Sequence, residues 1–158
     1  MAAAQDGHVS IVETLLAHHA NPNIADRSGM SALMYAANNN QPKIVALLIK
    51  AAADINQKNA SGGTAFLFAT QSGDIESVEL LLRMKVDINQ TNTDGNNALI
   101  AAVALGRLPI VKKLLASGIN IKHKNNAGQS ALDIARLANT PNKDAIIKLL
   151  EEAETKAP

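Results

Sequence analysis

The side chains that could do chemistry in this chain are few. His18 and His19 are adjacent, but neighbouring residues on a helix point in different directions, and zinc requires three or four converging ligands. No third ligand follows at a useful spacing. His19 takes the place of a helix-ending glycine, so a C-terminal cap explains it better than metal binding does. We therefore expect no metal site.

Acid–base or nucleophilic catalysis also lacks a suitable set of residues. Asp26, Asp94 and Asp133 stand where an aspartate serves as a turn or helix-start residue. The chain has no cysteine, no phosphate-binding glycine loop and no HExxH stretch. We therefore expect neither a cofactor nor enzymatic activity.

Lys122, His123 and Lys124 form a small basic cluster, and Lys112 and Lys113 precede it on a predicted helix. Aromatic residues make up only 2% of the 158 residues and the net charge is +1, so little is available for stacking on bases or attracting phosphates. A solvated face is the better interpretation, and nucleic acid is not the expected partner. No apolar run approaches the length of a membrane span, so we expect no membrane insertion.

These residues are carried by a unit that recurs along the chain. A glycine returns at an interval of 33 residues, followed two residues later by a short polar residue and then by alanine and a large apolar residue. The glycines are Gly29, Gly62, Gly95 and Gly128, and the polar residues are Ser31, Thr64, Asn97 and Ser130. A period of this length belongs to arrays in which no unit buries its apolar face alone.

Each unit carries two predicted helices. The recurring polar residue can cap the first, shorter helix, because its side chain can accept a backbone N–H bond. The second helix carries an apolar stripe at helical spacing, interrupted only at Ser77, and Gly73 and Gly106 suit tight turns between the two helices. The first stripes are Ile11, Val12, Leu15 and Leu16, then Ile44, Val45, Leu48 and Ile49.

The repeated unit resembles the ankyrin repeat. The family hallmark D-x-x-G-x-T-P-L-H-x-A is matched by DRSGMSALMYA, NASGGTAFLFA, NTDGNNALIAA and NNAGQSALDIA. The resemblance implies an all-α solenoid of stacked helix-turn-helix units with projecting β-hairpin-like loops. It divides the chain into units at about 1–25 (partial), 26–58, 59–91, 92–124 and 125–158 (a C-terminal cap), which we expect to form a single domain.

All four units depart from the hallmark at two positions. Alanine replaces the usual proline, and the usual histidine is replaced by Met34, Leu67, Ile100 or Asp133. In the family that histidine ties a unit's helix to its hairpin by hydrogen bonds. Its absence predicts hairpins that are less rigid than those of consensus arrays.

The resemblance implies that the chain binds a protein partner through a concave side made of hairpin tips and the exposed face of the first helices. Tyr35 and Phe68, one repeat apart, could form an apolar patch there with Met30 and Leu105, or could instead pad the seam between repeats. Carried over position by position, the expected partner-binding residues are Arg27, Met30, Tyr35, Asn38, Asn39, Phe68, Gln71, Ser72, Asp94, Asn96, Leu105, Asn126 and Gln129.

Asn56 and Asn89, in the sequence Asp-Ile-Asn, occupy positions where some ankyrin repeats are targets of asparaginyl hydroxylation. A hydrogen-bonding turn residue is the simpler interpretation of both. Hydroxylation would matter only in a cell that carries the hydroxylase.

An alternative to the protein-binding module is a structural or targeting fragment of a larger ankyrin-containing protein. Aligned on the repeat, Met1 falls at the Met34 position. A closed N-terminal side over residues 2–16 would favour a complete adaptor, whereas an open apolar side would favour the fragment. We expect a monomer. The compartment is left open by a cysteine-free chain, with the cytoplasm favoured over an exported form that would need a leader removed before Met1.

Overall fold

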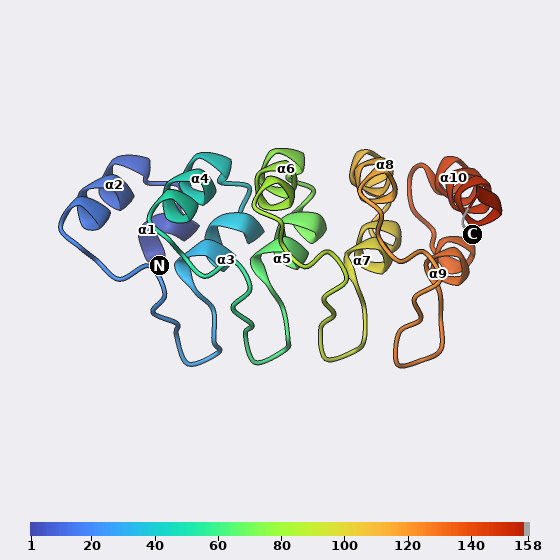
Figure 1. The fold of residues 1–158 in the computed structure, drawn as a ribbon, viewed down its shortest axis with the longest axis horizontal. Coiled ribbons are helices and arrows are strands. Elements are labelled where there is room, and N and C mark those ends of the chain that lie inside the picture. Colours follow the sequence, from blue (N-terminus) through green and yellow to red (C-terminus); the bar gives the residue numbers. More distant parts are fainter. Residues whose placement is uncertain (157–158) are drawn as a thin grey trace. The chain divides into compact units, whose positions relative to one another are not determined.

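The computed structural model describes residues 1–156, which form ten helices arranged mostly as antiparallel pairs (Figure 1). The chain divides into two compact units, Met1–Asp87 and Ile88–Pro158, and each is described by itself. The expected single domain over residues 1–158 therefore stays a prediction. Residues 157 and 158 of the expected C-terminal cap lie outside the described part of the chain.

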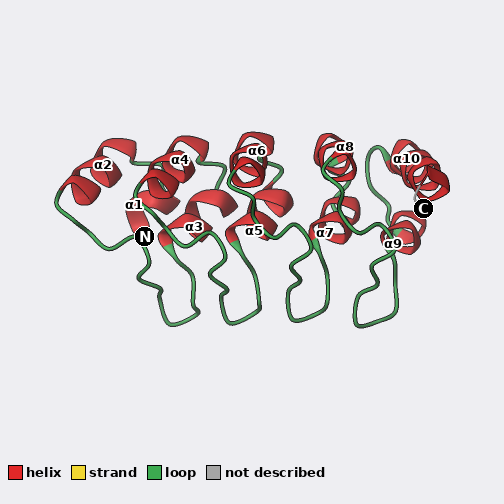
Figure 2. Ribbon diagram, in the orientation of Figure 1, coloured by secondary structure: helices red, strands yellow, loops and turns green. Residues whose placement is uncertain are grey.

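The first unit contains three helix pairs stacked in two layers (Figure 2). The first helices of the pairs form one layer, in which α3 packs against both α1 and α5, and the second helices form the other, in which α4 packs against both α2 and α6. The pairs are α1 (Ala2–Gln5) with α2 (Val9–Ala17), α3 (Ala32–Asn38) with α4 (Pro42–Lys50), and α5 (Ala65–Ser72) with α6 (Ile75–Arg83).

The second unit repeats the arrangement with two pairs. Helix α7 packs against α9, and α8 packs against α10. The pairs are α7 (Ala98–Ala104) with α8 (Leu108–Ala116), and α9 (Ala131–Leu137) with α10 (Lys143–Lys156). Both units therefore have the predicted all-α repeat architecture.

Each predicted cap residue begins the first helix of its pair. The side chains of Ser31, Thr64, Asn97 and Ser130 accept bonds from the backbone N–H three residues later, at 3.4, 3.3, 3.0 and 3.2 Å. Such a bond satisfies a donor that the helix itself cannot pair. The predicted caps are thus confirmed.

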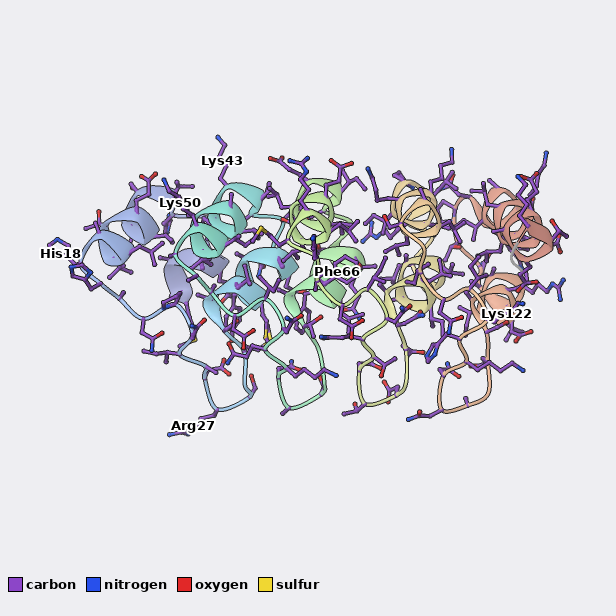
Figure 3. The ribbon with its side chains drawn as sticks, viewed as in Figure 1. His18, Arg27, Lys43, Lys50, Phe66 and Lys122 are labelled. Atoms are coloured by element: carbon purple, nitrogen blue, oxygen red, sulfur yellow. The ribbon has the colours of Figure 1, made fainter. Side chains whose placement is uncertain are left out.

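Small residues let the first helices approach closely. Ala36, Ala37 and Ala69 are completely buried in α3 and α5, beside the large apolar Phe66, which lies inside the helical layers in Figure 3. An alanine side chain lets two helix backbones come near each other without a void. The low aromatic content of the chain therefore suits its stacked helices.

The turns also follow the predicted chemistry. The φ angles of Gly73, Gly106 and His19 are 90°, 64° and 61°. All three lie in the left-handed region in which helices commonly end. Ser77, which interrupts the apolar stripe of α6, is buried and donates its hydroxyl to Asp74, whose side chain caps the same helix. The polar interruption is therefore fully paired.

The loops between helix pairs are hairpin-like, with little strand character. Within residues 1–156 the only β pairing consists of the isolated bridges Ala25–Ser31 and Lys124–Ser130. Each loop is closed by the residue at its start, whose side-chain oxygen accepts the backbone N–H groups two and four residues later. These residues are Asp26, Asn59, Asn92 and Asn125.

Candidate functional site

The first hairpin is hydrogen-bonded to one of the predicted site residues, Tyr35. Tyr35, half-buried on α3, donates its hydroxyl to Oδ2 of Asp26 at 2.7 Å. Asp26 Oδ1 accepts the hydroxyl of Ser28 at 2.7 Å and the backbone N–H of Met30 at 3.0 Å. Both carboxylate oxygens are therefore occupied, and the hairpin is joined to the helix that follows it.

These bonds shift two pKa values. The pKa of Asp26 is lowered to about 2, because hydrogen bonds stabilise its charged carboxylate. The largest contribution comes from the hydroxyl of Tyr35, followed by the hydroxyl of Ser28, and the backbone N–H groups of Met30 and Ser28 add to it. The same bond to Asp26 raises the pKa of Tyr35 above its usual value, because ionisation of the phenol would remove the donated proton. Asp26 is thus held as an anion that serves the structure of the hairpin.

Other predicted residues of the first hairpin and α3 divide into paired and outward-facing side chains. Asn39 donates its amide to the carbonyl oxygen of Tyr35 at 2.9 Å, and Asn59 donates its amide to the sulfur of Met30 at 3.3 Å. Arg27 and Asn38 are exposed, and Arg27 points away from the tip of the hairpin in Figure 3. Arg27 and Asn38 are therefore the outward-facing members of this group.

On α5 the predicted residues also contribute to packing. Phe68 is half-buried and its ring lies against Gly63, where an added Cβ would stand 2.9 Å from Cζ. Ser72 donates its hydroxyl to the carbonyl oxygen of Ala37 on α3 at 2.9 Å. Gln71 is half-buried on the same helix. Ser72 is thus engaged in joining two repeats.

Neighbouring hairpins are hydrogen-bonded to each other within each compact unit. In the first unit the backbone N–H of Ala60 donates to the carbonyl oxygen of Ser28 at 2.9 Å. In the second unit the backbone N–H of Asn126 donates to the carbonyl oxygen of Asp94 at 3.0 Å. The hairpin tips of each unit therefore lie side by side.

Two predicted residues of the second unit, Asn96 and Asn126, take part in that pairing through their side chains. The Asn126 side chain donates to the carbonyl oxygen of Thr93 at 2.8 Å, and the Asn96 side-chain oxygen accepts the amide of Asn125 at 3.0 Å. The backbone N–H of Gln129 donates to Asn125 Oδ1 at 3.0 Å. Asp94 has an exposed side chain at the tip. These polar residues build the hairpins and also form their surface.

A known family model, described as ankyrin repeats in three copies, matches residues 1–59 and 66–157 of the chain. The chain belongs to the ankyrin-repeat family. A search of curated proteins gave no significant match. Ankyrin repeats are generally protein–protein interaction modules and are typically non-catalytic.

The second unit of this ankyrin-repeat protein exposes two leucines at the ends of its first helices. Leu105, which ends α7, is 47% exposed, and Leu137, the last residue of α9, is 73% exposed. Ala104 beside Leu105 is exposed as well. Helices α7 and α9 pack against each other, so we call Ala104, Leu105 and Leu137 the leucine patch.

Leu137 is absent from the residues predicted as partner-binding, although its position in the repeat indicates it. It falls in register with Asn38, Gln71 and Ala104, positions that the ankyrin resemblance assigns to the concave side. Leu137 has 73% of its surface exposed at this position. Comparing the four units position by position would have found it.

The basic cluster is only partly a solvated face. Lys122 and Lys124 are exposed, but His123 is half-buried, with Nε2 2.7 Å from the carbonyl oxygen of Gly95 in the preceding ankyrin hairpin. The prediction of a solvated cluster is thus wrong for His123. A local sequence pattern misses this bond because its acceptor lies on another repeat.

The two asparagines considered for hydroxylation occupy the connections between ankyrin units. Oδ1 of Asn89 accepts the backbone N–H of Asn120 at 2.9 Å, and Asn23, one repeat before Asn56, likewise accepts the backbone N–H of Asp54 at 2.7 Å. The backbone N–H of Asn56 donates to Asp54 Oδ1 at 2.9 Å. These bonds account for asparagine in the connection, and hydroxylation stays a prediction.

Two further features bear on the class of site. No three histidine, aspartate or glutamate side chains gather closely enough to hold a metal ion in residues 1–156. Among the described helices none has the length and apolar composition needed to cross a membrane.

Proposed function

We propose that this ankyrin-repeat protein is a non-catalytic module that binds a partner protein through its hairpin tips and first helices. The observation that carries the proposal is the leucine patch of the second unit. Two leucines, 47% and 73% exposed on neighbouring helices, would gain contact with apolar side chains of a partner. An apolar centre with polar surroundings is the usual arrangement of a binding hot spot.

The first unit offers a second group of suitable side chains. Tyr35 and Phe68 are half-buried on α3 and α5, and Arg27 and Asn38 are exposed around them. Aromatic residues anchor many interfaces because they bury much area at little cost in conformational entropy. Tyr35 and Phe68 therefore stand as candidate contacts, together with the other predicted residues of both units.

The proposal is tested by partner capture with the intact chain as bait. Leu137→Asn and Leu105→Asn should each reduce recovery of the partner at least about tenfold, since a buried leucine contributes about 1.5–3 kcal/mol. Tyr35→Ala and Phe68→Ala test the first unit in the same assay. Met84→Asn is the matched control, because Met84 is 49% exposed but ends α6 in the second-helix layer.

Folding is compared by circular dichroism and thermal unfolding for every variant. Loss of capture in the leucine variants with an unchanged Tm supports the proposed surface. Unchanged capture by all four variants, with unchanged folding, would move the search to the second helices or α10.

A structural or targeting module within a larger ankyrin assembly is the second candidate function. One observation favours it: Ile11 and Leu15 on α2 are exposed apolar residues. The capture experiment separates the two candidates, because a purely structural module has no partner whose recovery depends on the leucine patch.

A further inference from the structure

The second-helix layer of the second unit carries an open groove. Helices α8 and α10 pack against each other in this layer (Figure 1), and the groove between them has a volume of about 300 Å³. Three apolar and three charged side chains line what we call the lysine groove: Leu108, Ala145, Leu149, Lys112, Lys148 and Glu152.

The two lysines of the groove are available to an anionic group. Lys112 comes from α8 and Lys148 from α10, and both side chains are exposed. Within residues 1–156 neither ammonium group donates a hydrogen bond or forms an ion pair, not even with Glu152 one helical turn after Lys148. Helix α8, with the sequence LPIVKKLLA, contains no acidic residue. Positive charge therefore prevails along the lysine groove.

The apolar side chains give the lysine groove a floor. Leu108 and Leu149 are half-buried, one on each helix, and Ala145 is exposed. Ala145 and Leu149 are four residues apart and share one face of α10. An apolar side chain placed between the two leucines would leave water and gain contacts. The lysine groove thus combines an apolar floor with two unpaired cations.

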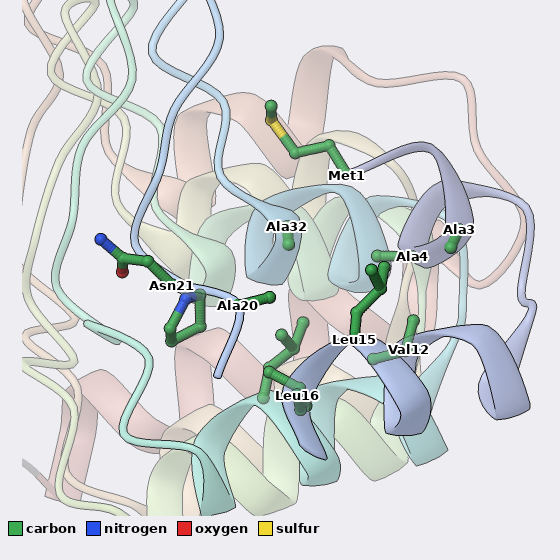
Figure 4. A pocket seen from close by; sticks show the side chains of 11 residues that line it. Met1, Ala3, Ala4, Val12, Leu15, Leu16, Ala20, Asn21 and Ala32 are labelled. Atoms are coloured by element: carbon green, nitrogen blue, oxygen red, sulfur yellow. The ribbon is translucent and has the colours of Figure 1, made fainter. Parts of the chain in front are cut away.

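Two hollows of the first unit lack this excess of positive charge. The groove between α2 and α4 is lined by one residue of each sign, Glu13 and Lys50. The cavity between the first two helix pairs (Figure 4) has a volume of only about 70 Å³, and none of its described lining residues is a lysine, arginine, aspartate or glutamate. The charge is therefore particular to the lysine groove and is not shared by both units.

We propose that the lysine groove binds an acidic segment of a partner protein. An apolar side chain of the segment contacts Leu108 and Leu149, and its carboxylates pair with the two lysines. Such an arrangement matches charge of opposite sign across the interface and removes apolar surface from water.

Two other anionic partners fit the lysine groove less well. Nucleic acid bases stack on aromatic rings, and none of the described lining residues is aromatic. Binding to an anionic membrane requires apolar side chains that enter the lipid, whereas Leu108 and Leu149 are half-buried. The lysine groove is also separate from the leucine patch, which belongs to α7 and α9, so the inference stands without the proposed function.

The probe is the acetylated peptide Glu-Glu-Leu-Leu-Glu-Glu, titrated into the intact isotope-labelled chain and followed by NMR. Saturable shifts should be confined to the amides of α8 and α10. The matched peptide with glutamine in place of glutamate should bind at least about threefold more weakly, because one exposed ion pair contributes up to about fivefold to an equilibrium constant. Added salt should weaken the acidic peptide more than the glutamine peptide.

Charge reversal in the lysine groove provides the variants. Lys112→Glu and Lys148→Glu should each weaken binding of the acidic peptide about two- to fivefold. Ala145→Glu, at an exposed residue, should also weaken it, because a carboxylate is added to the groove. Lys43→Glu is the matched control and should leave binding unchanged, since Lys43 is an exposed lysine of α4 in the first unit (Figure 3). Thermal unfolding verifies the folding of each variant.

Each outcome decides the proposal. Saturable shifts on α8 and α10 that both lysine variants weaken, and that Lys43→Glu leaves unchanged, support it. Equal binding of the two peptides, or the absence of a saturable shift, contradicts it. Shifts on α7 and α9 that Leu137→Asn abolishes would assign the peptide to the leucine patch, and the lysine groove would be wrong. If vesicles of phosphatidylserine broaden the α8 and α10 signals while the acidic peptide does not bind, the occupant is a membrane and the protein segment is wrong.

Discussion

The hydroxyl of Tyr35 donates a 2.7 Å hydrogen bond to Asp26 and thereby ties helix α3 to the hairpin before it. In consensus ankyrin repeats that tie comes from a histidine at the position of Met34, which here is buried and apolar. The next residue along the helix therefore supplies a connection that the sequence comparison predicted to be missing. The predicted looseness of the hairpins stays a prediction, and Tyr35 is the residue to test it on.

Stability should fall below pH 4 because of Asp26. Its pKa is about 2 in the folded chain and 3.8 without these bonds, so the unfolded state binds more protons between these values. The stabilisation is present above pH 4 and is lost as the pH falls towards 2. In Asp26→Asn this pH-dependent component should vanish, because asparagine does not titrate. The hairpin should still form, since an asparagine oxygen can accept the two backbone N–H groups, as Asn59 does. Urea unfolding from pH 5 to pH 2 measures it.

Tyr35→Phe should raise the pKa of Asp26 towards its usual value, because the largest stabilising bond is removed. NMR titration of the Asp26 carboxyl carbon checks the shift, and hydrogen exchange of residues 26–30 checks the rigidity of the hairpin. An unchanged pKa would show that Ser28 and the backbone suffice to hold the anion.

Thr64→Ala should lower the free energy of unfolding by about 1–2 kcal/mol. Thr64 is completely buried and its hydroxyl caps α5 through the backbone N–H of Leu67. Thr64→Ser keeps the hydroxyl and should lose much less. Chemical denaturation of both variants provides the comparison, and equal losses would assign the effect to the missing methyl group.

Gly29→Ala should destabilise the chain more than Gly128→Ala does. Both glycines have positive φ, 80° and 75°, a conformation that costs alanine on the order of 1 kcal/mol. At Gly29 the new Cβ would also stand 2.9 Å from the Cα of Asn59, whereas at Gly128 nothing lies within 4 Å. The difference in unfolding free energy isolates the close contact between hairpins, and equal costs would mean that the neighbouring hairpin shifts without penalty.

His123→Ala should cost about 1 kcal/mol, the usual value of one net hydrogen bond. The ring nitrogen Nε2 lies 2.7 Å from the carbonyl oxygen of Gly95. Gln57 and Gln90 hold the same repeat position, so His123→Gln should be nearly neutral. Thermal unfolding of the two variants distinguishes a hydrogen-bonding side chain from a merely solvated one.

Much of the fold could be predicted because it depends on short-range physics. A cap needs an acceptor side chain at one position, as Ser31 and Asn97 provide, and a left-handed turn needs a residue such as Gly73. The 33-residue period then specifies which helices stack, since every unit must bury the same apolar stripe. These features were readable from the chain without knowing any contact.

The candidate site was less predictable, because side chains at the same repeat position find different neighbours. The Ser72 hydroxyl bonds the carbonyl oxygen of Ala37 on the adjacent helix, a contact that its position in the repeat did not predict, and its role in partner binding stays a prediction. His123 was predicted to face water, but its ring lies 2.7 Å from the carbonyl oxygen of Gly95. Which partner such a side chain bonds depends on how one repeat packs against the next. Leu105 and Leu137, at the ends of α7 and α9, keep 47% and 73% of their surfaces exposed.

The sequence by itself therefore determined the repeat unit, its helices, its caps and its membership of the ankyrin-repeat family, because all of these depend on residue type and spacing within about one unit. Tertiary structure alone decided which copy of a repeated residue is buried. Ile11 and Ile44 occupy the same position in the pattern, yet their exposures are 48% and 0%. Burial depends on the helices on either side, and that information is not contained in the unit itself.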